Sequence, residues 1–365
     1  MNKIVLFLSQ SLSPGGSERR MVNLACLFKE KGYDVRFICM KDGDFYKSRL
    51  DEMKIPVEII YGSILNPFAV IRAIRNLKPY AVISLLETPN IINCMAAALK
   101  HSWVSITGES SSFNELHKEL SLLHVMRGKF MGWMMRFCDC LVCNSEHAKS
   151  LWIKAYPNYK GKVKTIYNPV ILGTIDSDYI PLSNHKCHIV VAASFQYLKN
   201  PIGLIHAVTK MQHKENIIID WYGGKANAYE DAVKLLDEQD LGDTIRLHGP
   251  TKDIHNIMNQ ADAVALFSRV EGLPNAICEA MMIGKPIVMT RVSDYSRLVT
   301  EANGFLCDWN DIDSIAAALD KVASLSAEAL QQMGKQSQAI AKTLFKLDTI
   351  ENEWLETIAS KHRYE

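Results

Sequence analysis

Residues 267–289 are Phe267-Ser-Arg-Val-Glu-Gly-Leu-Pro-Asn-Ala-Ile-Cys-Glu-Ala-Met-Met-Ile-Gly-Lys-Pro-Ile-Val-Met289. An apolar run ends near Phe267, a loop with glycine and proline follows, and residues with helical spacing begin near Asn275. Gly284-Lys-Pro286 ends this helix and leads into a second apolar run. Strand, loop, helix and strand in this order predict one unit of a parallel sheet covered by helices.

The same alternation runs along both halves of the chain. In the first half, apolar runs of strand length are separated by helical patterns, at residues 3–8, 34–39, 81–85, 103–106 and 140–143. A second series follows at residues 188–193, 217–221, 245–248, 263–267 and 286–289. Two such series predict two α/β domains, each with a doubly wound parallel sheet.

A polar, turn-rich linker at residues 171–183 separates the two series. A chain of 365 residues that is 48% apolar is long enough for two hydrophobic cores. We therefore expect an N-terminal domain at residues 1–171 and a C-terminal domain at residues 172–348. The last residues, 349–365, have a helical pattern and could pack back on the N-terminal domain.

Composition limits the partners and the compartment. The chain has 41 basic and 40 acidic residues, which gives no reason to expect nucleic-acid binding. Residues 1–170 carry 23 basic and 14 acidic residues, whereas the remainder carries 18 and 26, so the two halves differ in charge. The nine cysteines do not suit a disulfide framework, and no signal peptide or membrane-spanning run is visible. These features predict a cytoplasmic protein in a reducing compartment.

Two glutamates mark the most informative loop. Glu271 follows a strand and Glu279 lies about one turn into the next helix, on either side of Gly272-Leu273-Pro274-Asn275. In a parallel sheet, ligands bind at the carboxyl ends of the strands, where helix N-termini offer amide donors. A diphosphate could sit on these amides while a carboxylate accepts hydrogen bonds from two sugar hydroxyls. The alternative is an ordinary loop glutamate followed by a surface helix residue.

These residues resemble the signature of the retaining glycosyltransferases of family four. The signature is Glu-x7-Glu followed by Ala-Met and Gly-x-Pro-Val, and it is matched here by Glu271, Glu279, Ala280-Met281 and Gly284-Lys-Pro-Ile287. Further similarity extends over most of the chain, at Gly15-Gly16, Asn144-Ser145-Glu146, 247–249, 253–254 and 261–262, and residues 163–169 resemble the strand that precedes the linker in the family. The resemblance implies the GT-B fold, in which two facing Rossmann-like domains enclose a cleft. It also implies an acceptor-binding N-terminal domain and a donor-binding C-terminal domain.

The resemblance suggests roles for the donor site. Glu279 would hold the ribose hydroxyls of the donor, and Glu271 would contact its sugar. Lys199 lies in a loop after a strand, where a cation could meet the diphosphate, although it could also be a solvated loop residue. The family usually has an arginine five residues before this lysine, where this chain has Ser194. Arg269 and Arg291 are candidates for a substitute cation.

Gly15-Gly16, in the N-terminal half, is a further donor-binding candidate. It precedes a helix, so its backbone could approach a ligand closely, although Pro-Gly-Gly is also an ordinary turn.

The acceptor side is less clear. The family often has a histidine after the strand at residues 103–107, but this chain has Gly108-Glu109 there and His117 further on. Glu109 and His117 are therefore the candidates for acceptor contacts, and Glu109 could instead be a helix-capping residue.

We expect no metal. Cys138, Cys140 and Cys143 overlap an apolar strand whose alternation would place them on both faces, and no second Cys-x2-Cys exists. Asp176-Ser-Asp178 resembles the metal-binding Asp-x-Asp of the other major glycosyltransferase fold, but it falls in the linker. The departing diphosphate would then be stabilised by Lys199 and backbone amides.

A basic, aromatic helix is expected at residues 116–137. Its apolar residues could simply pack on the N-terminal sheet. Its basic and tryptophan residues also fit an anionic membrane surface, and the candidates for this contact are Lys118, Arg127, Lys129, Trp133 and Arg136. Both interpretations stay open at this stage.

The sequence thus predicts a metal-independent, retaining enzyme that transfers a hexose-type sugar. Its donor would be a UDP- or GDP-linked sugar, with no further cofactor, and its acceptor a saccharide or lipid-linked saccharide in the synthesis of surface polysaccharide or lipopolysaccharide. It would act in the cytoplasm or at the inner face of the cell membrane. The alternatives are a nucleotide-sugar epimerase on the same fold and a non-catalytic partner that binds sugar nucleotides.

Overall fold

The computed structural model of the chain describes residues 3–13, 15–109, 122–173, 175 and 186–361. The chain divides into two compact units: unit 1 contains residues 1–169 and 347–365, and unit 2 contains residues 170–346. The boundaries expected from the sequence, after residues 171 and 348, fall two residues further along the chain. The helical stretch expected at the end of the chain groups with unit 1.

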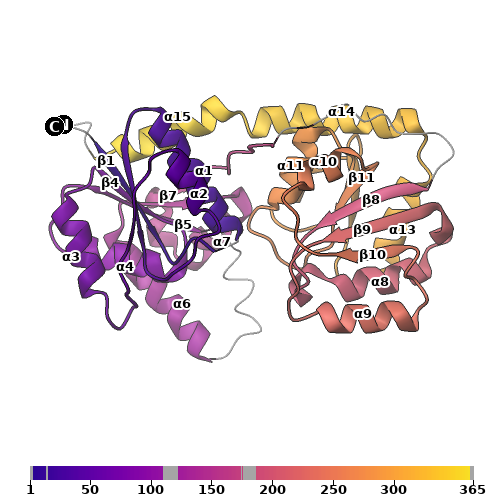
Figure 1. The fold of residues 1–365 in the computed structure, drawn as a ribbon, viewed down its shortest axis with the longest axis horizontal. Helices are drawn as coiled ribbons and strands as arrows, with labels where there is room; N and C mark the ends of the chain where they lie inside the picture. Colours follow the sequence, from indigo (N-terminus) through magenta and orange to yellow (C-terminus); the bar gives the residue numbers. More distant parts are fainter. Residues whose placement is uncertain (1–2, 14, 110–121, 174, 176–185, 362–365) are drawn as a thin grey trace. The chain divides into compact units, whose positions relative to one another are not determined.

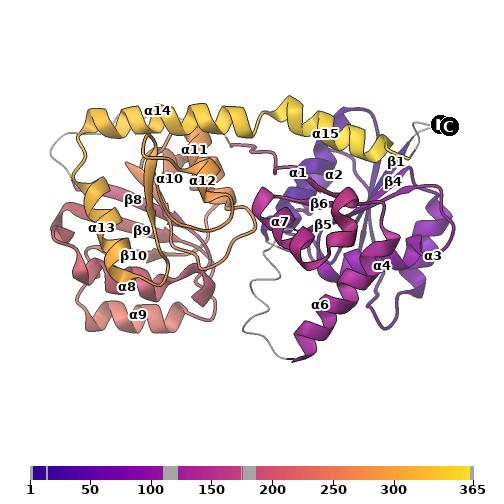
Figure 2. The same cartoon turned by 180° about the vertical axis from the view of Figure 1, so that it is seen from behind.

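Unit 1 has, in the part of the chain that the structure describes, a parallel sheet in the order β3-β2-β1-β4-β5-β6-β7. Its strands are β1 (Ile4–Ser9), β2 (Asp34–Cys39), β3 (Val57–Ile59), β4 (Ala81–Ser84), β5 (Val104–Glu109), β6 (Cys140–Cys143) and β7 (Val163–Thr165). Its helices are α1 (Gly16–Glu30), α2 (Lys47–Glu52), α3 (Phe68–Leu77), α4 (Glu87–Ala97), α6 (Leu122–Met134), α7 (Glu146–Ala155) and α15 (Leu347–Ala359). Helices α3, α4 and α6 cover one face of the sheet, and α1 and α15 cover the other (Figures 1 and 2).

Unit 2 repeats this plan, with a parallel sheet in the order β10-β9-β8-β11-β12-β13 among the described residues. Its strands are β8 (Cys187–Ala192), β9 (Ile217–Tyr222), β10 (Ile245–His248), β11 (Ala263–Leu266), β12 (Ile287–Thr290) and β13 (Gly304–Cys307). Its helices are α8 (Pro201–Lys210), α9 (Tyr229–Glu238), α10 (Ile254–Asn259), α11 (Asn275–Ile283), α12 (Tyr295–Leu298), α13 (Ile312–Ala323) and α14 (Ala327–Leu344). Helices α8, α9 and α13 cover one face, and α10, α11 and α14 cover the other (Figure 1).

The central strands are apolar along their length because each sheet is covered on both faces. In unit 1, Phe7 on β1 is fully buried and its ring stacks on that of Phe37 on β2, 5.1 Å away. In unit 2, Phe195 and Trp221 are buried and stack at 5.4 Å. This burial explains why most strands were visible as continuous apolar runs in the sequence.

Two short strands were not predicted. The first, β3, has three residues at the edge of its sheet, two of them exposed. The second, β13, begins with a glycine and has four residues, of which the two in the middle are only partly buried. Such short edge strands lack the apolar run from which a buried strand is recognised.

The turn at Gly284 ends α11 as the sequence predicted. Gly284 has a φ of 96°, a left-handed conformation that glycine adopts without steric cost. Its amide donates to the carbonyl of Ala280 at 3.0 Å, so α11 ends in a hydrogen-bonded turn before β12 begins. The residues that bracket the predicted donor loop are therefore held by a regular strand–helix–strand unit.

Candidate active site

The predicted donor residues gather at the carboxyl ends of the strands of unit 2. Lys199 follows β8 in a 3₁₀ turn at Tyr197–Lys199, Glu271 follows β11, and Glu279 lies in α11. Because β8 and β11 are neighbours in the sheet, their following loops lie side by side. The amide of Arg269 donates to the carbonyl of Leu198 at 2.8 Å and joins the two loops directly.

Lys199 and Glu271 form an ion pair. The ammonium of Lys199 donates to Oε1 of Glu271, and the hydroxyl of Ser268 donates to the same oxygen at 2.6 Å. Both charged side chains are partly exposed, at 23% for Lys199 and 12% for Glu271. The pair is thus held in place by its neighbours and is accessible from solvent on its own unit. Sequence reasoning had not singled out Ser268.

Glu279 is more deeply placed. The residue is buried in α11, and its Oε2 lies 3.3 Å from Nε2 of His255 on α10. Nδ1 of the same imidazole accepts the amide N–H of Gly173 at 2.9 Å. His255 was not predicted, because its partner Glu279 lies 24 residues away and no local pattern links them.

The loop between the two glutamates is anchored by its backbone. Gly272, Leu273 and Pro274 are buried, and α11 begins at Asn275. The hydroxyl of Ser293 donates to the carbonyl of Gly272. The position of the first helical turn is therefore fixed relative to Glu271.

Ser194 occupies the place of the arginine that the family usually has. It is partly buried in the loop after β8, beside Gly223 at the end of β9. A Cβ at Gly223 would lie 1.9 Å from the carbonyl oxygen of Ala193, so a glycine is needed for this close approach. Neither Ser194 nor Gly223 carries a charge of its own.

The two candidates for a substitute cation have other contacts. The guanidinium of Arg269 lies over the ring of Trp309, 4.4 Å from its centroid. Arg291 forms an ion pair with Asp308 at 2.8 Å. Trp309 also accepts a hydrogen bond on its carbonyl oxygen from the Asn200 amide at 2.9 Å. Lys199, in turn, is paired directly with the predicted donor residue Glu271.

Comparison with known proteins now identifies the family. Residues 14–173 match the family model described as Glycosyltransferase Family 4, and residues 180–339 match the one described as Glycosyl transferases group 1. The chain belongs to the family-four glycosyltransferases. Its homologues include bacterial glycosyltransferases of polysaccharide and lipopolysaccharide synthesis.

Two relatives align over nearly the whole family-four chain. A glycosyltransferase of Haemophilus influenzae is 26% identical over 97% of this chain and 99% of its own. An α-1,4-N-acetyl-D-galactosaminyltransferase of Campylobacter jejuni, whose acceptor is an undecaprenol-linked saccharide, is 24% identical over 97% of this chain and 98% of its own. The HepE protein of Anabaena in complex with UDP-glucose superposes with a TM-score of 0.81 at 20% identity, over 98% of this chain and 99% of that one. The predicted GT-B fold class is confirmed.

The glycine loop predicted for the donor and the predicted acceptor residue Glu109 lie in unit 1. Gly15 precedes α1, and its carbonyl accepts a hydrogen bond from the Tyr46 hydroxyl at 3.3 Å. Glu109, at the end of β5, is buried and accepts the indole N–H of Trp152 at 3.2 Å. His117 lies outside the described residues.

Glu109 belongs to a buried polar cluster with Arg20. Burial lowers the pKa of Arg20 to about 10, against the opposing influence of Cys143 and Glu109. The guanidinium also donates to the carbonyl of Ile166 at 3.4 Å and lies 5.9 Å from the ring centroid of Trp354. The Glu109 carboxylate thus lies inside unit 1, where it accepts a hydrogen bond from a tryptophan and is near enough to Arg20 to influence the pKa of its guanidinium.

Potential metal ligands do not converge in the part of the chain that the structure describes. No group of three or more His, Cys, Asp or Glu side chains there has the geometry to hold a metal ion. Cys138, Cys140 and Cys143 are free, buried thiols. Asp176 and Asp178 lie outside the described residues.

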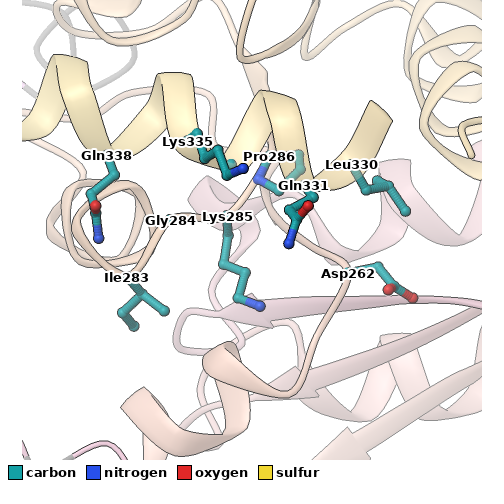
Figure 3. A pocket seen from close by; sticks show the side chains of 10 residues that line it. Asp262, Ile283, Gly284, Lys285, Pro286, Leu330, Gln331, Lys335 and Gln338 are labelled. Atoms are coloured by element: carbon teal, nitrogen blue, oxygen red, sulfur yellow. The ribbon is translucent and has the colours of Figure 1, made fainter. Parts of the chain in front are cut away.

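A hollow of about 150 Å³ lies on unit 2 away from the predicted donor residues (Figure 3). Its lining comes from α14, from the end of α11 with the turn before β12, and from the residue before β11: Asp262, Ile283, Gly284, Lys285, Pro286, Leu330, Gln331, Gly334, Lys335 and Gln338. Burial lowers the pKa of Lys285 to about 8, and its ammonium donates to the carbonyls of Asn259 and Ala261 at 2.6 and 2.9 Å. Lys285 therefore ties the end of α10 to β12.

The basic helix begins, in the described chain, at Leu122 and continues as α6. Its inner side is core, with Met131 and Met134 buried in the hydrophobic cluster on which α4 packs. Its outer side exposes Met126, Phe130 and Trp133, at 59%, 38% and 46%. None of the described helices has the length and apolar content needed to cross a membrane.

Proposed function

We propose that this family-four member is a retaining glycosyltransferase that moves a hexose-type sugar from a UDP- or GDP-linked donor to a saccharide or lipid-linked saccharide. The observation that carries the proposal is the group formed by Lys199, Glu271 and Ser268 at the carboxyl edge of the unit 2 sheet. The donor class is supported by the UDP-glucose complex of HepE, and the acceptor class by the undecaprenol-linked saccharide of the Campylobacter relative. The pathway would be the synthesis of surface polysaccharide.

The ion pair suggests how donor binding proceeds. Without a donor, Glu271 compensates the charge of Lys199. A diphosphate is a stronger partner for a lysine than one carboxylate, so it would draw the ammonium toward its oxygens. Glu271 would remain held by Ser268 and would become available to the hydroxyls of the donor sugar.

The chemical step breaks the bond between the anomeric carbon and the diphosphate. Negative charge grows on the departing phosphate oxygens while the sugar acquires oxocarbenium character. Lys199 and backbone amides near the start of α11 would stabilise the departing charge without a metal ion. The leaving phosphate, on this proposal, takes the proton of the acceptor hydroxyl, and the anomeric configuration is retained.

A donor screen followed by product analysis tests this function. Thermal unfolding in the presence of chelator should show stabilisation by UDP or GDP and by the matching nucleotide sugar. Turnover should then require an acceptor, and NMR of the product should show the anomeric configuration of the donor. Conversion of the donor sugar without an acceptor would indicate an epimerase, and binding without any turnover would indicate a non-catalytic partner. Activity that is lost in chelator and restored by a divalent ion would overturn metal independence.

We also propose that α6 holds the protein at an anionic membrane surface. Met126, Phe130 and Trp133 recur at helical spacing and form an exposed apolar stripe on a helix whose other side is core. Exposed Lys129 and Arg136 flank the stripe, and the Arg136 guanidinium lies 4.8 Å from the Trp133 ring centroid. Apolar and basic side chains together suit the boundary between acyl chains and anionic headgroups. Arg127 lies in α6 and Lys118 outside the described residues; both remain candidates.

Liposome co-sedimentation tests the membrane contact. Binding should be strong to vesicles with anionic lipid, weak to zwitterionic vesicles and reduced by salt. The variant Lys129→Gln/Arg136→Gln and the variant Trp133→Ser should each bind less, whereas the control Lys234→Gln, on exposed α9, should bind as the wild type does. Binding that is insensitive to salt and to both variants would leave α6 as a packing helix.

A further inference from the structure

His255 connects the linker segment of unit 2 to the predicted ribose-binding carboxylate. Its Nδ1 lies 2.9 Å from the amide nitrogen of Gly173, and its Nε2 lies 3.3 Å from Oε2 of Glu279. Both side chains of the pair are largely buried, with 15% of His255 and 10% of Glu279 exposed. The imidazole is therefore held on both ring nitrogens and has little freedom to turn.

The two contacts assign the tautomer. A backbone N–H can only donate, so Nδ1 must accept and carries no proton in this arrangement. The ring proton then lies on Nε2 and points at Glu279. A neutral imidazole satisfies both contacts, whereas a proton on Nδ1 would oppose the amide of Gly173.

We propose that His255 is a positioning residue for sugar-nucleotide binding: it orients the Glu279 carboxylate toward the two ribose hydroxyls. This inference rests on the proposed function, because it assumes that Glu279 meets the ribose. A ribose presents two neighbouring hydroxyls in a fixed geometry, so the carboxylate that receives them must hold one orientation. The Nε2–H bond fixes Oε2 from α10. Because an ionised carboxylate can accept several hydrogen bonds at once, it can also receive the hydroxyls.

The proposal predicts a property that plain packing would not give. If His255 acts through Glu279, removing the imidazole should weaken the binding of ribonucleotides more than the binding of 2′-deoxyribonucleotides, because only ribonucleotides offer both hydroxyls. A residue that merely supports the fold would weaken both ligands equally or lower the stability alone. Selectivity for ribose over deoxyribose is therefore the property to measure.

Calorimetry with nucleoside diphosphates makes this measurement on the full chain. UDP, GDP and their 2′-deoxy forms are titrated into the wild type, His255→Ala, His255→Gln, Glu279→Ala and the double variant His255→Ala/Glu279→Ala. His213→Ala is the matched control, since His213 is also in unit 2, is paired with Glu215, and is 62% exposed. Thermal unfolding of each variant shows whether it is folded.

His255→Ala should weaken the preferred ribonucleotide by about three- to tenfold, the range for one hydrogen bond, and should reduce the preference over the deoxy form. His255→Gln should restore most of that preference, because its amide can replace the Nε2–H donor. The double variant should bind no more weakly than Glu279→Ala alone. His213→Ala should bind as the wild type does.

Three outcomes would contradict the role of His255, and they distinguish its failure from the failure of the ribose assignment. If Glu279→Ala abolishes ribose preference but folded His255→Ala retains it, His255 has no positioning role and the proposed ribose assignment stands. If Glu279→Ala itself leaves the ribose preference unchanged, the ribose assignment is wrong and the role of His255 falls with it. Equal weakening of ribose and deoxyribose ligands by His255→Ala would show a structural role only.

Discussion

Charged side chains lie at the carboxyl ends of both sheets, but at different depths. In unit 2, Lys199 and Glu271 are partly exposed and contact each other. In unit 1, Arg20 and Glu109 are buried, and Trp152 donates to the glutamate. Solvent reaches both side chains of the first pair, whereas the Glu109 carboxylate of the second is buried against the Trp152 indole. We therefore expect ligand binding at the carboxyl edge of the unit 2 sheet, and we expect Glu109 to serve packing in unit 1.

The largest effect should come from neutralising the buried carboxylate of unit 1. Glu109→Gln keeps an oxygen that can accept the Trp152 indole N–H, but it removes the negative charge that compensates the positive charge of Arg20. We expect a loss of about 3 kcal/mol in the free energy of unfolding, because a buried charge loses compensation. Urea unfolding measures this loss, and binding of the nucleoside diphosphate should be unchanged. A stable variant with impaired turnover would instead favour Glu109 as an acceptor contact and break the comparison.

Glu279→Ala should show the reverse pattern in unit 2. Removing the Glu279 carboxylate should weaken binding of the sugar nucleotide by about 2–3 kcal/mol, since hydrogen bonds to a charged group are lost. Calorimetry with the donor and with the free nucleotide measures the change. Unchanged affinity for both ligands would remove Glu279 from the donor site.

Lys199→Ala should lower kcat/KM by more than about tenfold, or ~1.4 kcal/mol, because phosphate charge grows as the bond breaks. Steady-state kinetics compares it with Arg269→Ala and Arg291→Ala, whose charges contact Trp309 and Asp308. These two variants should have milder effects. A mild Lys199→Ala with a severe Arg269→Ala or Arg291→Ala would move the phosphate site to the substitute cation.

Ser194→Arg is the complementary variant. If the corner beside Gly223 still faces the diphosphate, the added cation should tighten donor binding. No change in any of these four variants would contradict the diphosphate site as a whole.

The sequence predicted the buried framework better than the polar site. Runs such as 188–193 and 263–267 are apolar because parallel strands are covered on both faces, and they became β8 and β11. Strands β3 and β13 were missed since an edge strand of three or four residues needs no apolar run. Local pattern thus follows burial and fails where burial is incomplete.

The polar residues of the candidate donor site could be predicted only where they belong to a known sequence motif. Glu271, Glu279 and Lys199 were found from the Glu-x7-Glu signature and its context. His255 and Ser268 were not, although each donates to one of these glutamates. Their contacts depend on how α10 and the β11 loop pack, which spacing along the chain does not encode.

The smallest predicted effect tests whether the two cores are alike despite their different edges. Burial raises the pKa of Cys39 in unit 1 and of Cys307 in unit 2 from 9.0 to about 12. Well below pH 9 both thiols are protonated whether the chain is folded or unfolded. As the pH rises from 9 toward 12, the unfolded chain ionises first, so the folded state loses the stability that these thiols contribute.

Each buried thiol should therefore cost about 1 kcal/mol of stability between about pH 7.5 and about pH 9.5. Cys39→Ala and Cys307→Ala are compared with the wild type by urea unfolding at the two pH values. Each variant starts from a lower stability because it leaves a small cavity, but it should lose less on going to the higher pH. If the alkaline loss of stability is reduced by a similar amount in the two variants, the two cores exclude water equally. The units then differ in the polar residues at the carboxyl edge. Cys307→Ala alone could instead lose as much free energy of unfolding at the higher pH as the wild type does. That result would mean that water reaches β13, and the difference between the units would then extend below the edge of the sheet.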